Sequence, residues 1–114
     1  MAFGQPVPAI DVAAARGRDG GAVLLDVRED DEWAAGHAPD ARHVPMSRLG
    51  DHAAELPRDT EIVVICRSGN RSAAVTEALV GAGFTAVNMA GGMQAWAAAG
   101  YPVVTDAGAP GAVI

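Results

Sequence analysis

The segment CRSGNR, residues 66–71, holds the only cysteine of the chain and two of its arginines. The β-branched run EIVVI lies directly before it, and apolar residues at helical spacing follow it, which predicts a strand, a short loop and a helix. The first N–H groups of such a helix are unpaired, and with the helix dipole they stabilise anions, thiolates included. The pattern therefore predicts that Cys66 is a nucleophile with a lowered thiol pKa.

The residues after Cys66 have the types that a cradle for an anion or a bound atom requires. Small and turn-tolerant residues let successive backbone N–H groups converge, and two arginines add positive charge. In the alternative interpretation Cys66 is a buried small hydrophobe at a strand end, which leaves the two arginines beside a glycine turn unexplained. The predicted site therefore has Cys66 as its catalytic residue and a substrate-binding set of Arg67, Ser68, Gly69, Asn70, Arg71 and Ser72.

The elements that must position this loop alternate along the chain as in an α/β fold with a parallel sheet. We expect strands near residues 7–10, 22–27, 43–45, 61–66 and 86–89, and helices near residues 12–16, 31–35, 48–55, 72–82 and 93–99. Ligands of such sheets bind beyond the carboxyl ends of the strands. Three loops share that edge, at residues 26–29, 66–71 and 90–92.

Composition limits the classes of function. The chain has 114 residues, enough for one domain, and half of them are apolar. All eight basic residues are arginine, so lysine chemistry such as Schiff-base formation is excluded. A net charge of −6 argues against nucleic acid as a partner. One cysteine and three scattered histidines predict neither an internal disulfide nor a metal site.

No apolar run approaches the roughly 20 residues that span a bilayer, and residues 1–10 have no signal-peptide pattern. We therefore expect no membrane partner and a cytoplasmic location. The alanine-rich, lysine-free composition also indicates a bacterial source with GC-rich codons.

Three segments together resemble the rhodanese-like sulfurtransferases. They are LLDVREDDEWAAGHAPDARHVP, VVICRSGNRSAAVTEALVGAGF and VNMAGGMQAWAAAGYPV, in the order that the family has them. The resemblance spans residues 7–104 and departs from the family pattern at residues 38–43, where many relatives carry a hydrophobic residue, Gly-Ala and Asn. It implies a three-layer fold with a central parallel five-stranded sheet flanked by helices on both faces. It also implies one domain over residues 1–104, followed by a tail, residues 105–114, whose small residues predict flexibility.

The resemblance further implies sulfur transfer through a Cys66 persulfide, from a small anionic donor such as thiosulfate to a thiol or cyanide, with no cofactor. In this family four residues separate the cysteine from the last loop position, whereas related phosphatases have five. Arg71 occupies the shorter position and Ser72 the longer one, which favours sulfur over phosphate. Two alternatives stay open: a sulfur-relay module fed by a protein donor or acceptor, and a phosphatase or arsenate reductase of the same fold.

Other residues have candidate supporting roles. Asp26 and Arg28 are predicted to form an ion pair that fixes the loop after the second strand. Gly91 and Gly92 predict at least a tight turn and allow close approach of the backbone to the site. The two tryptophans, Trp33 and Trp96, are predicted to be core residues, and the three histidines, His37, His43 and His52, are not predicted to act as bases.

Overall fold

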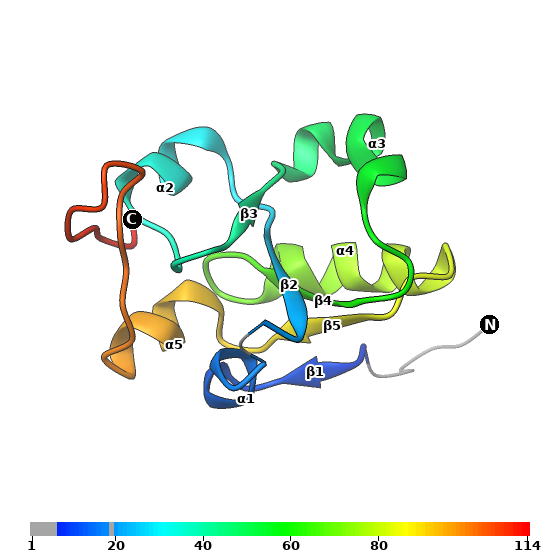
Figure 1. Ribbon diagram of the computed structural model, residues 1–114, viewed down its shortest axis with the longest axis horizontal. Helices are drawn as coiled ribbons and strands as arrows, with labels where there is room; N and C mark the ends of the chain where they lie inside the picture. The colour runs from blue at the N-terminus through cyan, green and yellow to red at the C-terminus, as the bar shows by residue number, and fades with distance from the viewer. Residues whose placement is uncertain (1–6, 19) are drawn as a thin grey trace.

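A computed structural model describes residues 7–18 and 20–114 of the chain (Figure 1). Residues 1–6, the first part of the predicted domain, and Asp19 lie outside the described residues. Within the described part, no helix is both long enough and apolar enough to cross a membrane.

All the strands pair in parallel in one sheet with the order β1-β5-β4-β2-β3. The strands are β1 (Ala9–Ile10), β2 (Ala22–Asp26), β3 (Arg42–His43), β4 (Glu61–Ile65) and β5 (Ala86–Met89). The central strand β4 is buried from its second residue to its last, as expected for a β-branched run covered on both faces. The predicted α/β fold with a parallel five-stranded sheet is confirmed.

Helices cover both faces of this sheet. The helical segments are α1 (Val12–Arg16), α2 (Asp30–Ala35), η1 (Met46–Arg48), α3 (Leu49–His52), η2 (Ala53–Glu55), α4 (Asn70–Gly81) and α5 (Gly92–Ala98). Val64 and Cys66 share one core cluster with Val75 and Leu79 of α4, while the alternate β4 residues belong to a second cluster with α1 and α5. Because side chains alternate along a strand, the cysteine faces α4.

The bounds of two helical segments differ from the predicted ones. The helix predicted at residues 48–55 is a single α-helical turn between two 3₁₀ turns. Arg48 and His52 have ψ near zero, at 4° and −1°, and these residues interrupt the α-helical backbone on either side of α3. Helix α4 begins at Asn70, two residues earlier than predicted, because Gly69 at φ 101° lets the chain turn into the helix directly.

The C-terminal segment packs against α2 and the second core cluster. Residues 105–114 were predicted to be flexible, but the chain turns at Thr105 and Gly108 and runs back beside α2 (Figure 1). Ala112 donates its N–H to Ala35, and Val113 packs against the second core cluster. Flexibility of this segment stays a prediction. Small residues give no periodic signal for such packing, whereas glycines permit the close approach of two backbones. A Cβ on Gly36 would lie 2.6 Å from the nitrogen of Ala112.

Candidate active site

Cys66 lies directly after β4, at the carboxyl edge of the sheet, and is fully buried. Two donors lie within hydrogen-bond distance of its sulfur. The Gly69 N–H lies 3.1 Å from Sγ, and the Ser72 hydroxyl lies 3.2 Å from it. The loop and the first turn of α4 therefore direct donors at the sulfur, as the sequence predicts.

The protonation state of Cys66 follows from two opposing effects. Burial alone raises the pKa of the thiol, because a buried charge loses hydration. The hydrogen bond from the Ser72 hydroxyl and those of the loop N–H groups favour the thiolate and outweigh burial, so the pKa lies below its ordinary value. These N–H groups belong to Ser72, Gly69 and Ser68.

The outer side of the loop is held by the start of α5. Met93 donates its N–H to the Cys66 carbonyl at 2.8 Å, and Gln94 donates to the Arg67 carbonyl at 3.0 Å. Gly92, at φ 60°, brings the two backbones together, since a Cβ there would lie 2.6 Å from the Cys66 carbonyl oxygen. The Gly91–Gly92 turn therefore contacts the loop of residues 66–71 itself.

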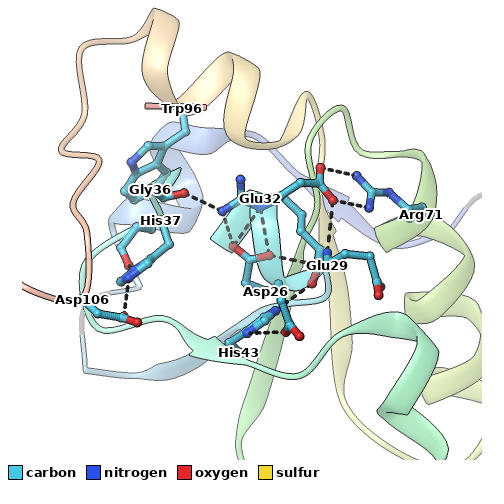
Figure 2. Close-up of polar contacts among 12 residues, drawn as sticks. Asp26, Glu29, Glu32, Gly36, His37, His43, Arg71, Trp96 and Asp106 are labelled. Atoms are coloured by element: carbon cyan, nitrogen blue, oxygen red, sulfur yellow. Dashed lines mark hydrogen bonds and ion pairs between the residues drawn. The ribbon is translucent and has the colours of Figure 1, made fainter. Parts of the chain in front are cut away.

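Arg71 is held in an ion pair with Glu32 of α2. Its Nη1 and Nη2 atoms donate to the two carboxylate oxygens at 2.7 and 2.8 Å, as Figure 2 shows. These bonds lower the pKa of Glu32 and raise that of Arg71. Glu32 also accepts the Glu29 N–H in a capping box, and this bond helps to hold its carboxylate in place. The predicted contact of Arg71 with substrate stays a prediction, because a carboxylate already pairs with its guanidinium.

Arg67 is exposed and has different partners. Its Nε donates to the main-chain oxygen of Ile114 at 2.9 Å. With its carboxamide oxygen turned inward, Gln94 accepts from both terminal nitrogens of the guanidinium at 3.2 Å. Within residues 7–18 and 20–114, no Asp or Glu side chain forms a salt bridge with Arg67. Of the two loop arginines, Arg67 is therefore the one whose charge no described carboxylate side chain offsets.

The predicted ion pair between Asp26 and Arg28 forms at the neighbouring strand end, and both side chains are fully buried. Arg28 Nη2 donates to Asp26 at 2.9 Å and to the Gly36 carbonyl at 2.8 Å. The contacts of this pair fix the turns on either side of α2 (Figure 2). None of these hydrogen bonds reaches Cys66, and a supporting role of the pair at the site stays a prediction.

The aromatic residues divide between two roles. Trp96 is a core residue as predicted, 3% exposed, and its indole N–H donates to Pro102. Trp33 is half-buried and outside both core clusters, so the prediction of a core position was wrong. Its ring stacks between His37 and His43, with centroid distances of 3.5 and 4.7 Å. The two faces of this indole are therefore covered by imidazole rings, whereas a tryptophan in the core packs against apolar side chains.

The ring nitrogens of the histidines contact groups away from the sulfur. His37 bonds with Asp106 at 2.9 Å, and His43 bonds with the Arg28 carbonyl at 2.7 Å. His52 bonds with Glu55 at 2.8 Å. Among the residues that the structure describes, no group of three or more His, Cys, Asp or Glu side chains is arranged to hold a metal ion.

Sequence reasoning missed two residues that contact the loop. Glu32 gave no distinct signal, because acidic residues are common in the first turn of a helix. Asn88 of β5 donates its side-chain amide to the Gly69 carbonyl at 3.1 Å. Its signal was an amide in a short apolar strand, where asparagine is depleted. The remaining loop residues, Ser68 and Asn70, are exposed at the surface above the sulfur.

Comparisons with known proteins point to one family. The family described as "Rhodanese-like domain" matches residues 10–99. The chain is 48% identical over 73 residues to the putative sulfurtransferase YtwF of Bacillus subtilis, covering 64% of this chain and 71% of that protein. It is 38% identical over 92 residues to the thiosulfate sulfurtransferase GlpE of Pseudomonas savastanoi pv. phaseolicola, covering 80% and 86%.

A solved structure shares the fold closely. The rhodanese-related protein of Thermoplasma volcanium is 37% identical, with a TM-score of 0.83 over 87% of this chain and 99% of that one. Together with the named relatives, this similarity supports a transferase of sulfur-containing groups.

Gly92→Ala tests whether the close approach of α5 holds the nucleophile loop. Gly92 and Gly100 both have positive φ, at 60° and 79°, so alanine at either position costs about 1–2 kcal/mol of backbone strain. Only at Gly92 does the new methyl group meet the loop backbone, and we expect a further loss of about 1–3 kcal/mol. Urea unfolding of both variants measures the difference. Equal losses would contradict a holding role for Gly92.

Glu32→Gln tests the ion pair with Arg71. The pKa of Glu32 is lower in the folded chain than its ordinary value of 4.5. The pair therefore stabilises the fold above that pH, and the contribution is lost as pH falls through the folded pKa. We expect the free energy of unfolding of wild type to exceed that of Glu32→Gln by about 1 kcal/mol at pH 7, and this difference to shrink as the pH falls below 4.5. Urea unfolding at several pH values, with the exposed Glu77→Gln as control, measures it; a gap independent of pH would exclude the ion pair as its source.

Proposed function

Because this chain belongs to the rhodanese-like family, we propose that it moves a sulfane sulfur from a small anionic donor such as thiosulfate to a thiol or cyanide acceptor. The observation that carries the proposal is the environment of the Cys66 sulfur. Two donors, the Gly69 N–H and the Ser72 hydroxyl, bond to it within 3.2 Å and favour the thiolate. A thiolate is the form of cysteine that attacks sulfur.

The proposed reaction has two steps and needs no other cysteine. The Cys66 thiolate attacks the outer sulfur of thiosulfate, a bond from Sγ to that sulfur forms, and the sulfur–sulfur bond of the donor breaks. Sulfite leaves with the bonding electron pair, and a persulfide anion remains on Cys66. The acceptor then attacks the outer sulfur, and the Sγ–S bond breaks to restore the thiolate. Cyanide becomes thiocyanate, and a thiol acceptor becomes a persulfide after losing its proton.

The loop supplies electrostatic stabilisation in both steps. Before attack the charge is on Sγ, and afterwards it is on the outer sulfur, which lies one bond further from the sheet. The hydrogen-bond donors of residues 67–72 surround this path in the proposal, and no described base is required to generate the nucleophile. The loop length supports sulfur rather than phosphate as the group held there.

Intact mass spectrometry tests the reaction. We expect wild-type protein incubated with thiosulfate to gain the mass of one sulfur, and cyanide to remove it with release of an equal amount of thiocyanate. Cys66→Ser should gain no sulfur. If wild type gains no sulfur from thiosulfate but gains one from a protein persulfide, the donor is a protein and the sulfur-relay alternative is favoured. If wild type gains none from either, the proposed function fails.

Arg67→Ala tests which arginine recognises the donor. The Arg67 guanidinium pairs with no described carboxylate side chain, whereas Glu32 occupies Arg71. We expect Arg67→Ala to raise the KM for thiosulfate about tenfold, with a smaller change for an uncharged organic polysulfide donor. The control is Arg42→Ala, because Arg42 is an exposed arginine on the edge strand β3. Equal effects of Arg67→Ala on the two donors would remove this arginine from recognition of charge.

A further inference from the structure

Asn88 is a buried polar residue in the middle of the sheet that the proposed reaction does not use directly. It is 7% exposed and lies in β5, paired with Val64 of β4 on one side and with Ala9 of β1 on the other. Its own N–H donates to the Pro8 carbonyl at 2.7 Å, so its backbone belongs to the sheet. The side chain is therefore anchored on a rigid element beneath the nucleophile loop.

Among the described residues, the side chain of Asn88 makes one hydrogen bond, and that bond is to the loop. Nδ2 donates to the Gly69 carbonyl at 3.1 Å. The same carbonyl also accepts the Ala73 N–H at 3.1 Å, a hydrogen bond of the first turn of α4. One oxygen thus ties the loop both to the sheet and to the helix. Meanwhile the N–H of Gly69 lies 3.1 Å from Cys66 Sγ.

The other side-chain atom of Asn88 has no hydrogen-bond partner within the described part of the chain. Oδ1 is buried and unpaired. A half-satisfied buried amide costs stability, and an apolar residue of similar size avoids that cost. An asparagine at this position is therefore unfavourable for packing alone, and its single bond to the loop is the contact that offsets the cost.

Gly69 is the point where the loop is least constrained by its own sequence. It has φ 101°, and without a Cβ it can adopt many other backbone conformations. A rotation of its peptide groups would turn its N–H away from the sulfur. The carbonyl and the N–H of Gly69 belong to two successive planar peptide groups that meet at its Cα. A bond from a rigid strand to this carbonyl holds one of these groups and the Cα in place, and so restricts the rotations that would carry the N–H away from the sulfur.

We propose that Asn88 is a positioning residue, whose amide holds the Gly69 carbonyl to the sheet and so keeps the Gly69 N–H directed at Cys66 Sγ. It touches neither the donor nor the sulfur. This inference rests on the proposed function, because the cradle matters for transfer only if Cys66 carries the sulfur. The arrangement of the cradle itself can nevertheless be measured without any sulfur donor.

The test is the pH dependence of Cys66 alkylation by iodoacetamide, followed by intact mass, in wild type and Asn88→Leu. Leucine fills the site but donates no hydrogen bond. We expect the midpoint of the pH–rate profile to move upward by about half to one pH unit, because a donor directed at the thiolate is lost. The variant leaves unchanged the Ser72 hydroxyl on the sulfur and the ion pair of Arg71 with Glu32.

The control is Val87→Ala, on the neighbouring position of β5. Val87 packs against the second core cluster and has no side-chain bond to the loop. It should lower the thermal midpoint of unfolding and leave the alkylation midpoint at its wild-type pH, which separates positioning from stability. If Asn88→Leu does not fold, Asn88→Ala carries the same comparison.

A folded Asn88 variant with a wild-type pH–rate midpoint would overturn the inference. This outcome is distinct from failure of the proposed function, in which wild-type protein gains no sulfur from any donor tested. Alkylation uses no donor, so a shifted midpoint supports the positioning role in either case.

Discussion

The site depends on a geometric rule of the peptide group. A loop that directs its N–H groups toward one atom must direct its carbonyl groups away from it, and buried carbonyls need partners of their own. Here the carbonyls of Cys66 and Arg67 accept N–H groups from the start of α5, and that of Gly69 accepts from α4 and from the sheet. The loop around the sulfur is held because these carbonyls are bonded to α5, α4 and β5.

The charges around the loop form a second layer of organisation on an acidic chain. A carboxylate of α2 holds one loop arginine, while a main-chain oxygen and an amide side chain hold the other. The first arginine links α2 to α4, and no described carboxylate side chain pairs with the second. Two arginines four residues apart in one motif therefore have different environments, which the motif itself does not reveal.

The fold was predictable from the sequence to the extent that periodicity and motifs determine it. The buried strand EIVVI, the helix after it and the convergence of three loops at one sheet edge follow from local patterns and from the topology of parallel sheets. The partners of Arg71 and Gly69 were not predictable, because they lie 39 and 19 residues away. The stack of Trp33 on two imidazoles and the packing of the C-terminal segment likewise depend on contacts between distant residues, for which a single sequence carries no periodic signal.

The return of the C-terminal segment also bears on how the chain is made. His37 exchanges backbone hydrogen bonds with Val104, and Ala35 accepts from Ala112, so the turn after α2 is completed by residues about 70 positions later. Strand β1 similarly pairs only with β5. Contacts of such long sequence separation slow folding, since the ends of a long loop must first meet. During synthesis, the turn after α2 and the strand β1 therefore lack these partners until β5 and the C-terminal residues have emerged from the ribosome. The fold is then completed late rather than in order from the N-terminus.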